Sequence, residues 1–178
     1  NWTNVQIKSL GMASEIQVHD NFLSEKELDN VKSIIFPCGN LNHFSWFFQQ
    51  NKSKDDGLIQ FTHVLYRDNT INSDFFDVIN PLIEKLNVLS LIKVKINLQL
   101  RDSKLSESIL HHDVTIKSQD QNTGIFYLNT NNGYTFFENG ERVDSVENRI
   151  VIFPSSRLHA GTTHTDAPYR CVINLNWI

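Results

Sequence analysis

The stretch KVKINLQL, residues 93 to 100, alternates strictly between polar and apolar side chains. Lys95, Asn97 and Gln99 occupy one set of alternate positions, and the positions between them carry Val, Ile or Leu. Because successive side chains of a β-strand point to opposite faces, this period of two predicts a strand with one polar and one apolar face.

Strand patterns then continue to the end of the chain. The Asn139-Gly140 pair between two of them is a strong signal for a hairpin turn. Many short strands of this kind predict an antiparallel jelly roll, buttressed by helices on one face. The further strand segments are TGIFYLN (123–129), GYTFFENGERVDSV (133–146), NRIVIF (148–153) and YRCVINLNWI (169–178).

The first half of the chain is predicted to be helical or mixed. In LSEKELDNVKSIIF (23–36), Ser24 is placed to cap a helix and Glu27 to complete a capping box. The segment SDFFDVINPLIEKLNVLS (73–90) also has helical spacing, with a kink expected at Pro81. We therefore expect one domain over residues 1–178, with a helical or mixed N-terminal region (residues 1–91) and a jelly-roll core (residues 92–178).

Composition excludes several classes of protein. The 178 residues include 40% hydrophobic and 20% charged residues, which is ordinary for a globular domain. The net charge of -4 argues against a general nucleic-acid or membrane-surface binder. Cys38 and Cys171 fit no metal-binding spacing, so we interpret them as free thiols of a reducing compartment. With no sorting signal in the sequence, a cytoplasmic location is expected.

The segment SESILHHDVTIKS (106–118) contains an unusual concentration of polar chemistry. On a strand, His111 and Asp113 would project to the same face, while His112 would point to the opposite face. His111 and Asp113 therefore supply two possible metal ligands, and a third must come from elsewhere in the chain.

Two later histidines could provide the third ligand. His159, in FPSSRLHAG (153–161), follows a strongly apolar strand, and His164 lies among turn residues closer to the last strand. We prefer His159 for this reason. Two imidazoles and one carboxylate form a facial triad that favours Fe(II).

Arg170 is the next unusual residue. Period two on the last strand places Arg170 on one face with Val172, Asn174 and Asn176, whereas the other face is apolar enough to be the packed one. Arg170 would then point into a polar interior, where an unpaired guanidinium is costly. A dicarboxylate cofactor would pair with it in bidentate geometry, although an exposed position at the start of a strand is the alternative.

These motifs together resemble the Fe(II)- and 2-oxoglutarate-dependent dioxygenases. Within them the chain looks most like the prolyl 4-hydroxylase-like branch, which includes small phage and bacterial members. The resemblance runs from about Val94 to the end and also includes the N-terminal segment DNFLSEKELDNVKSII (20–35). It rests on IFYLNTNNGYTFFENG (125–140), NRIVIFPSSRLHAG (148–161) and YRCVINLNW (169–177).

The resemblance implies a double-stranded β-helix, the cupin-like form of the jelly roll, with iron on His111, Asp113 and His159. No catalytic side chain beyond these ligands is expected. 2-Oxoglutarate would chelate the iron through its keto and near carboxylate groups, and Arg170 would clamp its far carboxylate. Tyr127 matches the family's tyrosine that donates to that carboxylate, although packing is the more common role of a buried tyrosine.

Further polar residues are expected at the pocket. The expected roles of these residues are less specific, because polar residues that alternate on an edge strand could equally face water. As cosubstrate contacts we name Asn97, Gln99 and Asn174, and as substrate contacts Asn176, Arg101 and Arg157.

The resemblance implies an enzyme that hydroxylates a C–H bond and converts 2-oxoglutarate and O2 to succinate and CO2. Ascorbate is expected to support this activity. The expected substrate is a peptidyl residue, with proline the leading candidate, or a small amino-acid-like metabolite. One alternative is a non-catalytic jelly-roll module that binds a metal. Another is a nucleic-acid dealkylase of the same superfamily, but no second Arg follows Arg170. We therefore expect neither nucleic acid nor membrane as a partner.

Overall fold

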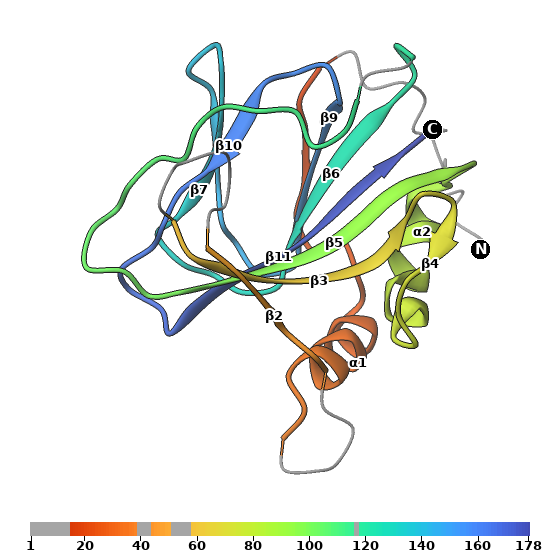
Figure 1. Cartoon of the computed structure of the whole chain (residues 1–178), viewed down its shortest axis with the longest axis horizontal. Coiled ribbons are helices and arrows are strands. Elements are labelled where there is room, and N and C mark those ends of the chain that lie inside the picture. Colours follow the sequence, from red (N-terminus) through yellow and green to blue (C-terminus); the bar gives the residue numbers. More distant parts are fainter. Residues whose placement is uncertain (1–14, 39–43, 51–57, 116–117) are drawn as a thin grey trace, which may run out of the picture.

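The structure is a computed structural model that describes residues 15–38, 44–50, 58–115 and 118–178. These residues form two antiparallel sheets flanked by helices (Figure 1). The larger sheet has the order β1-β9-β6-β11-β5-β3-β2, with β4 paired to β3, and the smaller sheet has the order β10-β7-β8. The predicted mainly β jelly roll with flanking helices is confirmed. The strands are β1 (Gln17–His19), β2 (Phe47–Gln49), β3 (Gln60–Arg67), β4 (Thr70–Ile71), β5 (Leu91–Leu100), β6 (Asn122–Tyr127), β7 (Tyr134–Phe137), β8 (Arg142–Asp144), β9 (Arg149–Pro154), β10 (His159–Gly161) and β11 (Tyr169–Trp177).

The helices pack on one face of the larger sheet, away from β7 and β10 (Figure 1). Helix α1 (Glu25–Ile35) begins where the sequence predicts, since Ser24 Oγ accepts from the Glu27 backbone N–H and Glu27 Oε2 accepts from the Ser24 N–H at 2.8 Å. The apolar face predicted for the last strand lies in this core. Its members Cys171, Ile173, Leu175 and Trp177 are all buried there.

The second predicted helix differs from the expectation. Residues 73–90 do not form one helix kinked at Pro81 but a 3-10 helix η1 (Phe76–Ile79) followed by α2 (Asn80–Leu86). Pro81 stands in the first turn of α2, where its missing N–H has no intrahelical acceptor to lose. None of the helices in the described ranges is long and apolar enough to cross a membrane.

The hairpin predicted at Asn139-Gly140 joins β7 to β8, and Gly140 adopts the positive φ of 85° that such turns require. The predicted mixed region also contributes strands, because β2 and β3 extend the larger sheet beyond β5. Strand β3 owes its place to long-range pairing with β5, which a local pattern does not encode. Residues 1–14 of the predicted N-terminal region lie outside the described residues.

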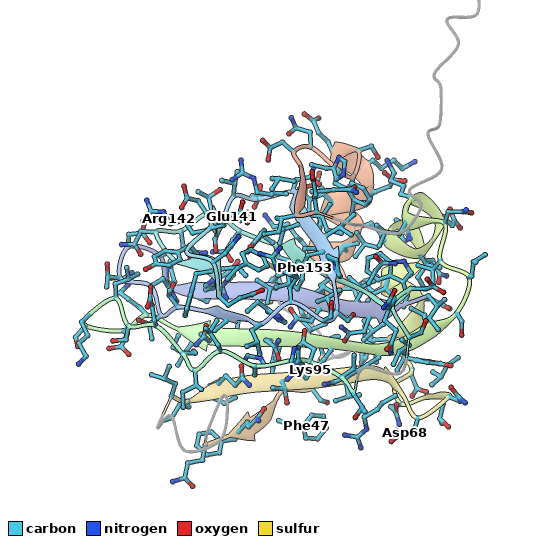
Figure 2. The ribbon with its side chains drawn as sticks, turned by 90° about the horizontal axis from the view of Figure 1, so that it is seen from above. Phe47, Asp68, Lys95, Glu141, Arg142 and Phe153 are labelled. Carbon is cyan, nitrogen blue, oxygen red and sulfur yellow. The ribbon has the colours of Figure 1, made fainter. Side chains whose placement is uncertain are left out.

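The inner face of the larger sheet is divided into an apolar and a polar half. Near β6 and β9, apolar side chains pack against Phe137 and Val143 of the smaller sheet. Near β5 and β3, the inner face carries the polar residues of the alternating strand instead. Phe153 marks the apolar half and Lys95 the polar half (Figure 2). The functional chemistry is concentrated in the polar half.

Asn148 joins the start of α1 to the sheet. Its Oδ1 accepts from the Leu23 N–H at 2.8 Å, and its Nδ2 donates to the Leu23 carbonyl at 2.8 Å. Both groups are buried, and Asn148 itself has a φ of 62°. One side chain therefore satisfies the buried backbone just ahead of the helix cap.

We expect Asn148→Ala to lower the free energy of unfolding by about 3 kcal/mol, because it leaves a buried N–H and a buried carbonyl unpaired. Asn148→Gly loses the same hydrogen bonds but accepts the positive φ, so it should be more stable than the alanine variant by about 1 kcal/mol. Urea denaturation of the three proteins measures both differences. Equal stability of wild type and Asn148→Ala would contradict the role of this side chain.

Candidate active site

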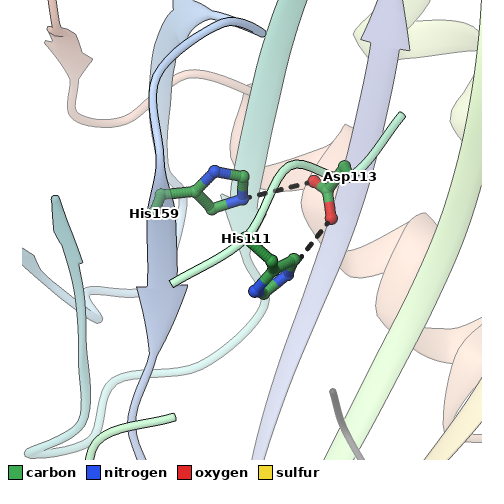
Figure 3. Close-up of side chains that lie close together, drawn as sticks. All are labelled: His111, Asp113 and His159. Carbon is green, nitrogen blue, oxygen red and sulfur yellow. Dashed lines mark ion pairs between the residues drawn. The ribbon is translucent and has the colours of Figure 1, made fainter. Parts of the chain in front are cut away.

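Two histidines and one aspartate converge on a single point (Figure 3). One potential ligand atom from each of His111, Asp113 and His159 lies within 4.8 Å of the other two. His111 Nε2 is 3.7 Å from Asp113 Oδ1, and His159 Nε2 is 3.4 Å from Asp113 Oδ2. The structure therefore brings together the three residues that the sequence singled out.

Backbone pairing places the two histidines side by side. The His111 N–H donates to the His159 carbonyl at 3.0 Å, and the His159 N–H donates to the His111 carbonyl at 3.2 Å. His159 begins β10, whereas His111 forms only this isolated bridge. The expectation that 111–113 lie on a regular strand is therefore wrong, because Asp113 occupies a bend immediately after the bridge.

The separation of His112 from its neighbours is as expected. His112 Nε2 is hydrogen-bonded to the Ser156 carbonyl at 3.0 Å, so the ring is held away from the triad. The Nδ1 atoms of the two triad histidines lie 2.9 Å and 3.3 Å from the carbonyls of Ile109 and Arg157. A carbonyl can only accept, so each Nδ1 carries a hydrogen and each Nε2 faces Asp113. Nε2 donates to the carboxylate when the ring is protonated, and in the neutral ring its lone pair is free to bind a metal.

Asp113 is a buried carboxylate held ionised by its neighbours. Burial would raise its pKa, but hydrogen bonds from His111 and His159 outweigh that effect and hold the pKa well below its usual value. Lys93 Nζ donates to the Asp113 main-chain carbonyl at 3.0 Å, which fixes the bend. Two oriented imidazole nitrogens and one ionised oxygen form a donor set that fits a divalent iron.

Arg170 lies in the same pocket, buried and with 5% of its surface exposed. Its Nε donates to Ser145 Oγ at 3.0 Å, and its guanidinium carbon lies 5.7 Å from the centre of the Tyr127 ring. Within the described residues of the chain, no carboxylate forms an ion pair with it, and burial lowers its pKa. Gly133 leaves room for this side chain, since a Cβ there would lie 3.1 Å from Arg170 Cδ.

The pocket lies between the two sheets and is partly open to solvent. It spans both the triad and Arg170, so a metal and a small dicarboxylate could be held together. Its further lining residues come from several strands: Gln60, Lys95, Asn97, Gln99, Ile125, Thr135, Gly161, Val172 and Asn174.

The predicted cosubstrate contacts Asn97, Gln99 and Asn174 all line this pocket. Tyr127 lies beneath the guanidinium of Arg170 instead of on the pocket wall, and its hydroxyl donates to Thr135 Oγ1 at 2.8 Å. Burial raises the pKa of Tyr127, so this hydroxyl keeps its proton.

The predicted substrate contacts are not among the described residues that line the pocket. Asn176 is buried and donates to Thr123 Oγ1 at 2.9 Å. Arg101 donates to the Ala167 carbonyl at 3.0 Å, and Arg157 pairs with Glu138 at 2.8 Å. Each of these polar groups thus has a partner elsewhere.

His164, the alternative third ligand, is buried but lies outside the group of potential ligands formed by the described residues. Burial, together with the nearby Arg170, lowers its pKa and favours the neutral ring.

Three polar pocket residues were not predicted as functional: Gln60, Lys95 and Thr135. The sequence pattern could have identified Lys95, because it lies on the same polar face of the strand as Asn97 and Gln99. Gln60 reaches the pocket through the pairing of β3 with β5, and no local pattern marks it.

No protein-family model and no curated protein sequence matches the chain. Solved structures do match. A viral collagen prolyl hydroxylase from Paramecium Bursaria Chlorella virus-1, in complex with 2OG, has a TM-score of 0.59 and 14% identity, covering 91% of this chain and 94% of that chain. An oxidoreductase of the 2OG-Fe(II) oxygenase family from Burkholderia pseudomallei has a TM-score of 0.65 and 8% identity, covering 91% and 84%.

A third similar structure is the non-heme α-ketoglutarate-dependent epimerase SnoN of nogalamycin biosynthesis. It has a TM-score of 0.60 and 13% identity, covering 92% of this chain and 76% of that chain. Together these structures show that the chain has the double-stranded β-helix fold of the 2OG-Fe(II) oxygenases, so the predicted resemblance is confirmed at the level of the fold.

We expect Asp113→Ala and His159→Ala to weaken Fe(II) binding by at least about 100-fold, because each removes one of three ligands. His112→Ala is the matched control and should bind Fe(II) like wild type, since its ring is turned toward Ser156. Anaerobic titration with Fe(II), followed by calorimetry, measures the affinities. A comparable loss in the His112 variant would show that the metal lies elsewhere.

Proposed function

We propose that the chain is an Fe(II)- and 2-oxoglutarate-dependent dioxygenase that hydroxylates a C–H bond of an organic substrate. The observation that carries this proposal is the presence, in one pocket, of the three ligands and a buried arginine without an acidic partner among the described residues. The three ligands fit a metal ion, and the arginine fits a carboxylate that lies some distance from that metal.

The three ligands would hold the iron and leave coordination positions for other molecules. When bound, iron of this kind supplies the activation of dioxygen for C–H oxidation, coupled to conversion of 2-oxoglutarate to succinate and CO2. His111 and His159 present their Nε2 atoms because their Nδ1 hydrogens are held by backbone carbonyls. Asp113 supplies the charge that favours a dication over water.

Arg170 would bind the far carboxylate of 2-oxoglutarate. A guanidinium presents two parallel N–H groups to a carboxylate, and burial strengthens this interaction because little water competes. Ser145 holds Nε at 3.0 Å and the Tyr127 ring supports the guanidinium, so its orientation is set before the ligand arrives. Thr135, which also lines the pocket, is held by the Tyr127 hydroxyl.

Two apolar side chains, Ile125 and Val172, form part of the pocket wall. Val172 follows Arg170 by two positions on the inner face of β11, and Ile125 of β6 pairs with Asn174. These side chains suit the methylene groups of 2-oxoglutarate and exclude water from its length. The arrangement supports a cosubstrate that is anionic at both ends and apolar in the middle.

Two substrate classes fit a dioxygenase of this fold: a peptidyl residue, with proline the leading candidate, and a small amino-acid-like metabolite. The viral relative described above is a collagen prolyl hydroxylase, whereas SnoN is an epimerase of antibiotic biosynthesis. The fold therefore does not select between these classes, and the residues that line the pocket have to do so.

We expect the purified protein, supplied with Fe(II), ascorbate and labelled 2-oxoglutarate, to release succinate slowly even without a primary substrate. Asp113→Ala should abolish this release, because the variant no longer holds the metal, and His112→Ala should retain it. Counting labelled succinate measures the turnover. If wild type neither turns over nor binds 2-oxoglutarate, the chain is a non-catalytic metal-binding module instead.

We expect Arg170→Gln to weaken 2-oxoglutarate binding by about 100-fold, since it removes one partner of a buried charge pair. Fe(II) binding should stay unchanged, because Arg170 touches none of the three ligands. Arg142→Gln is the matched control, as Arg142 is exposed on β8 (Figure 2). Its guanidinium lies over the Tyr134 ring, away from the pocket residues. Calorimetric titration with each ligand separates the two effects, and an equal fall in both affinities would contradict the assigned role.

A further inference from the structure

The pocket contains a second cationic side chain, Lys95, at the end nearest the metal ligands. Lys95 belongs to β5 and lines the pocket (Figure 2). Its register partners are Asn174 of β11 on one side and Val64 of β3 on the other. Asn174 in turn donates to Asp113 Oδ2 at 3.5 Å. Lys95 is half-buried, and among the described residues no side chain forms an ion pair with it.

Two amide oxygens without partners lie near this lysine on paired strands. Asn97 Oδ1 and Asn174 Oδ1 are buried, line the pocket and accept no hydrogen bond from any described group. Asn174 has a set orientation, because its Nδ2 faces the carboxylate of Asp113. The pocket therefore presents acceptors beside a cation, and unpaired buried acceptors are costly.

The backbone register separates Lys95 from Arg170, the residue expected to bind the far carboxylate of 2-oxoglutarate. The rows Arg170–Gln99 and Asn174–Lys95 lie four positions apart on paired strands, which corresponds to about 13 Å. The cosubstrate has four carbon–carbon bonds of about 1.5 Å each, so its carboxyl carbons are at most about 6 Å apart. Arg170 also turns away from Lys95, toward Ser145 and Tyr127.

In the filled pocket Lys95 would still lack a carboxylate of its own. The far carboxylate of 2-oxoglutarate would pair with Arg170, while its near carboxylate and Asp113 would bind the metal. The neighbouring Lys93 adds a further positive charge, and its ammonium is held by the Asp113 carbonyl. A carboxylate beside Lys95 therefore has to come from another molecule.

We propose that Lys95 binds the carboxylate of the primary substrate while the amide oxygens of Asn97 and Asn174 accept from its amino group. The substrate is then a free amino acid or a similar small zwitterion, with both charged groups recognised next to the metal site. An internal residue of a peptide has neither group. This inference rests on the proposed function and decides between its two substrate classes.

The test is a binding experiment that needs no turnover. The protein is loaded with Mn²⁺ in place of iron and with 2-oxoglutarate, without oxygen. It is then mixed with the twenty common L-amino acids, with their carboxamides, and with the same residues capped as N-acetyl amides. Bound Mn²⁺ accelerates the relaxation of nearby ligand protons, so nuclear magnetic resonance reports which compounds occupy the site and how tightly.

At least one free amino acid should bind at least about tenfold more tightly than its carboxamide, because a charged hydrogen bond is lost in the amide. Lys95→Gln should remove this preference, and Lys95→Arg should restore it in part. Lys26→Gln, which removes the same charge from the exposed face of α1, is the matched control and should behave like wild type.

Three results would overturn the inference while leaving the proposed function intact. They are normal 2-oxoglutarate binding with no free amino acid bound, equal binding of acids and capped amides, and an unchanged preference in Lys95→Gln. A loss of 2-oxoglutarate affinity in Lys95→Gln as large as in Arg170→Gln would also overturn it, because Lys95 would then belong to the cosubstrate. Failure of wild type to bind 2-oxoglutarate at all would instead overturn the proposed function.

Discussion

The side chains of Asp113 and Arg170 lie between the two sheets, where both are largely shielded from water. Each is stabilised mainly by the groups that hold it in place. Two imidazoles keep Asp113 ionised, while a hydroxyl and an aromatic ring support Arg170. An isolated buried charge is expensive, and these two are matched in full only when ligands of opposite charge enter the pocket. That requirement defines what the pocket accepts.

The opposite face of the larger sheet offsets this cost. There α1 and α2 close a continuous apolar core against β5, β6, β9 and β11, and Asn148 satisfies the buried backbone at the entry to α1. Alternate positions of β11 thus have two different roles. Cys171, Ile173 and Leu175 pack in the apolar core, and the residues that alternate with them line the pocket. Such local conflict between packing and polarity is typical of functional sites, which are stabilised by the rest of the fold.

The fold is shared with proteins whose names describe different reactions, including a prolyl hydroxylase and an epimerase. The double-stranded β-helix therefore supplies a frame for metal and cosubstrate, and selectivity has to arise from side chains that differ among its members. In this chain Lys95 and the unpaired amides beside it are such side chains. They extend the pocket from the metal ligands along β5, opposite to the direction of Arg170.

The local pattern of the sequence determined which side chains share a face. Period two separated Arg170 and Asn174 from the apolar positions of β11 and identified the polar face of β5, because the direction of a strand's side chain depends only on its position. The partners across the pocket depended on tertiary structure. The bridge between His111 and His159, the register that sets Lys95 beside Asn174, and the approach of Gln60 through β3 all join residues distant in the chain. Such pairings are decided by the burial of whole faces and by backbone hydrogen bonds between strands, which no short segment contains.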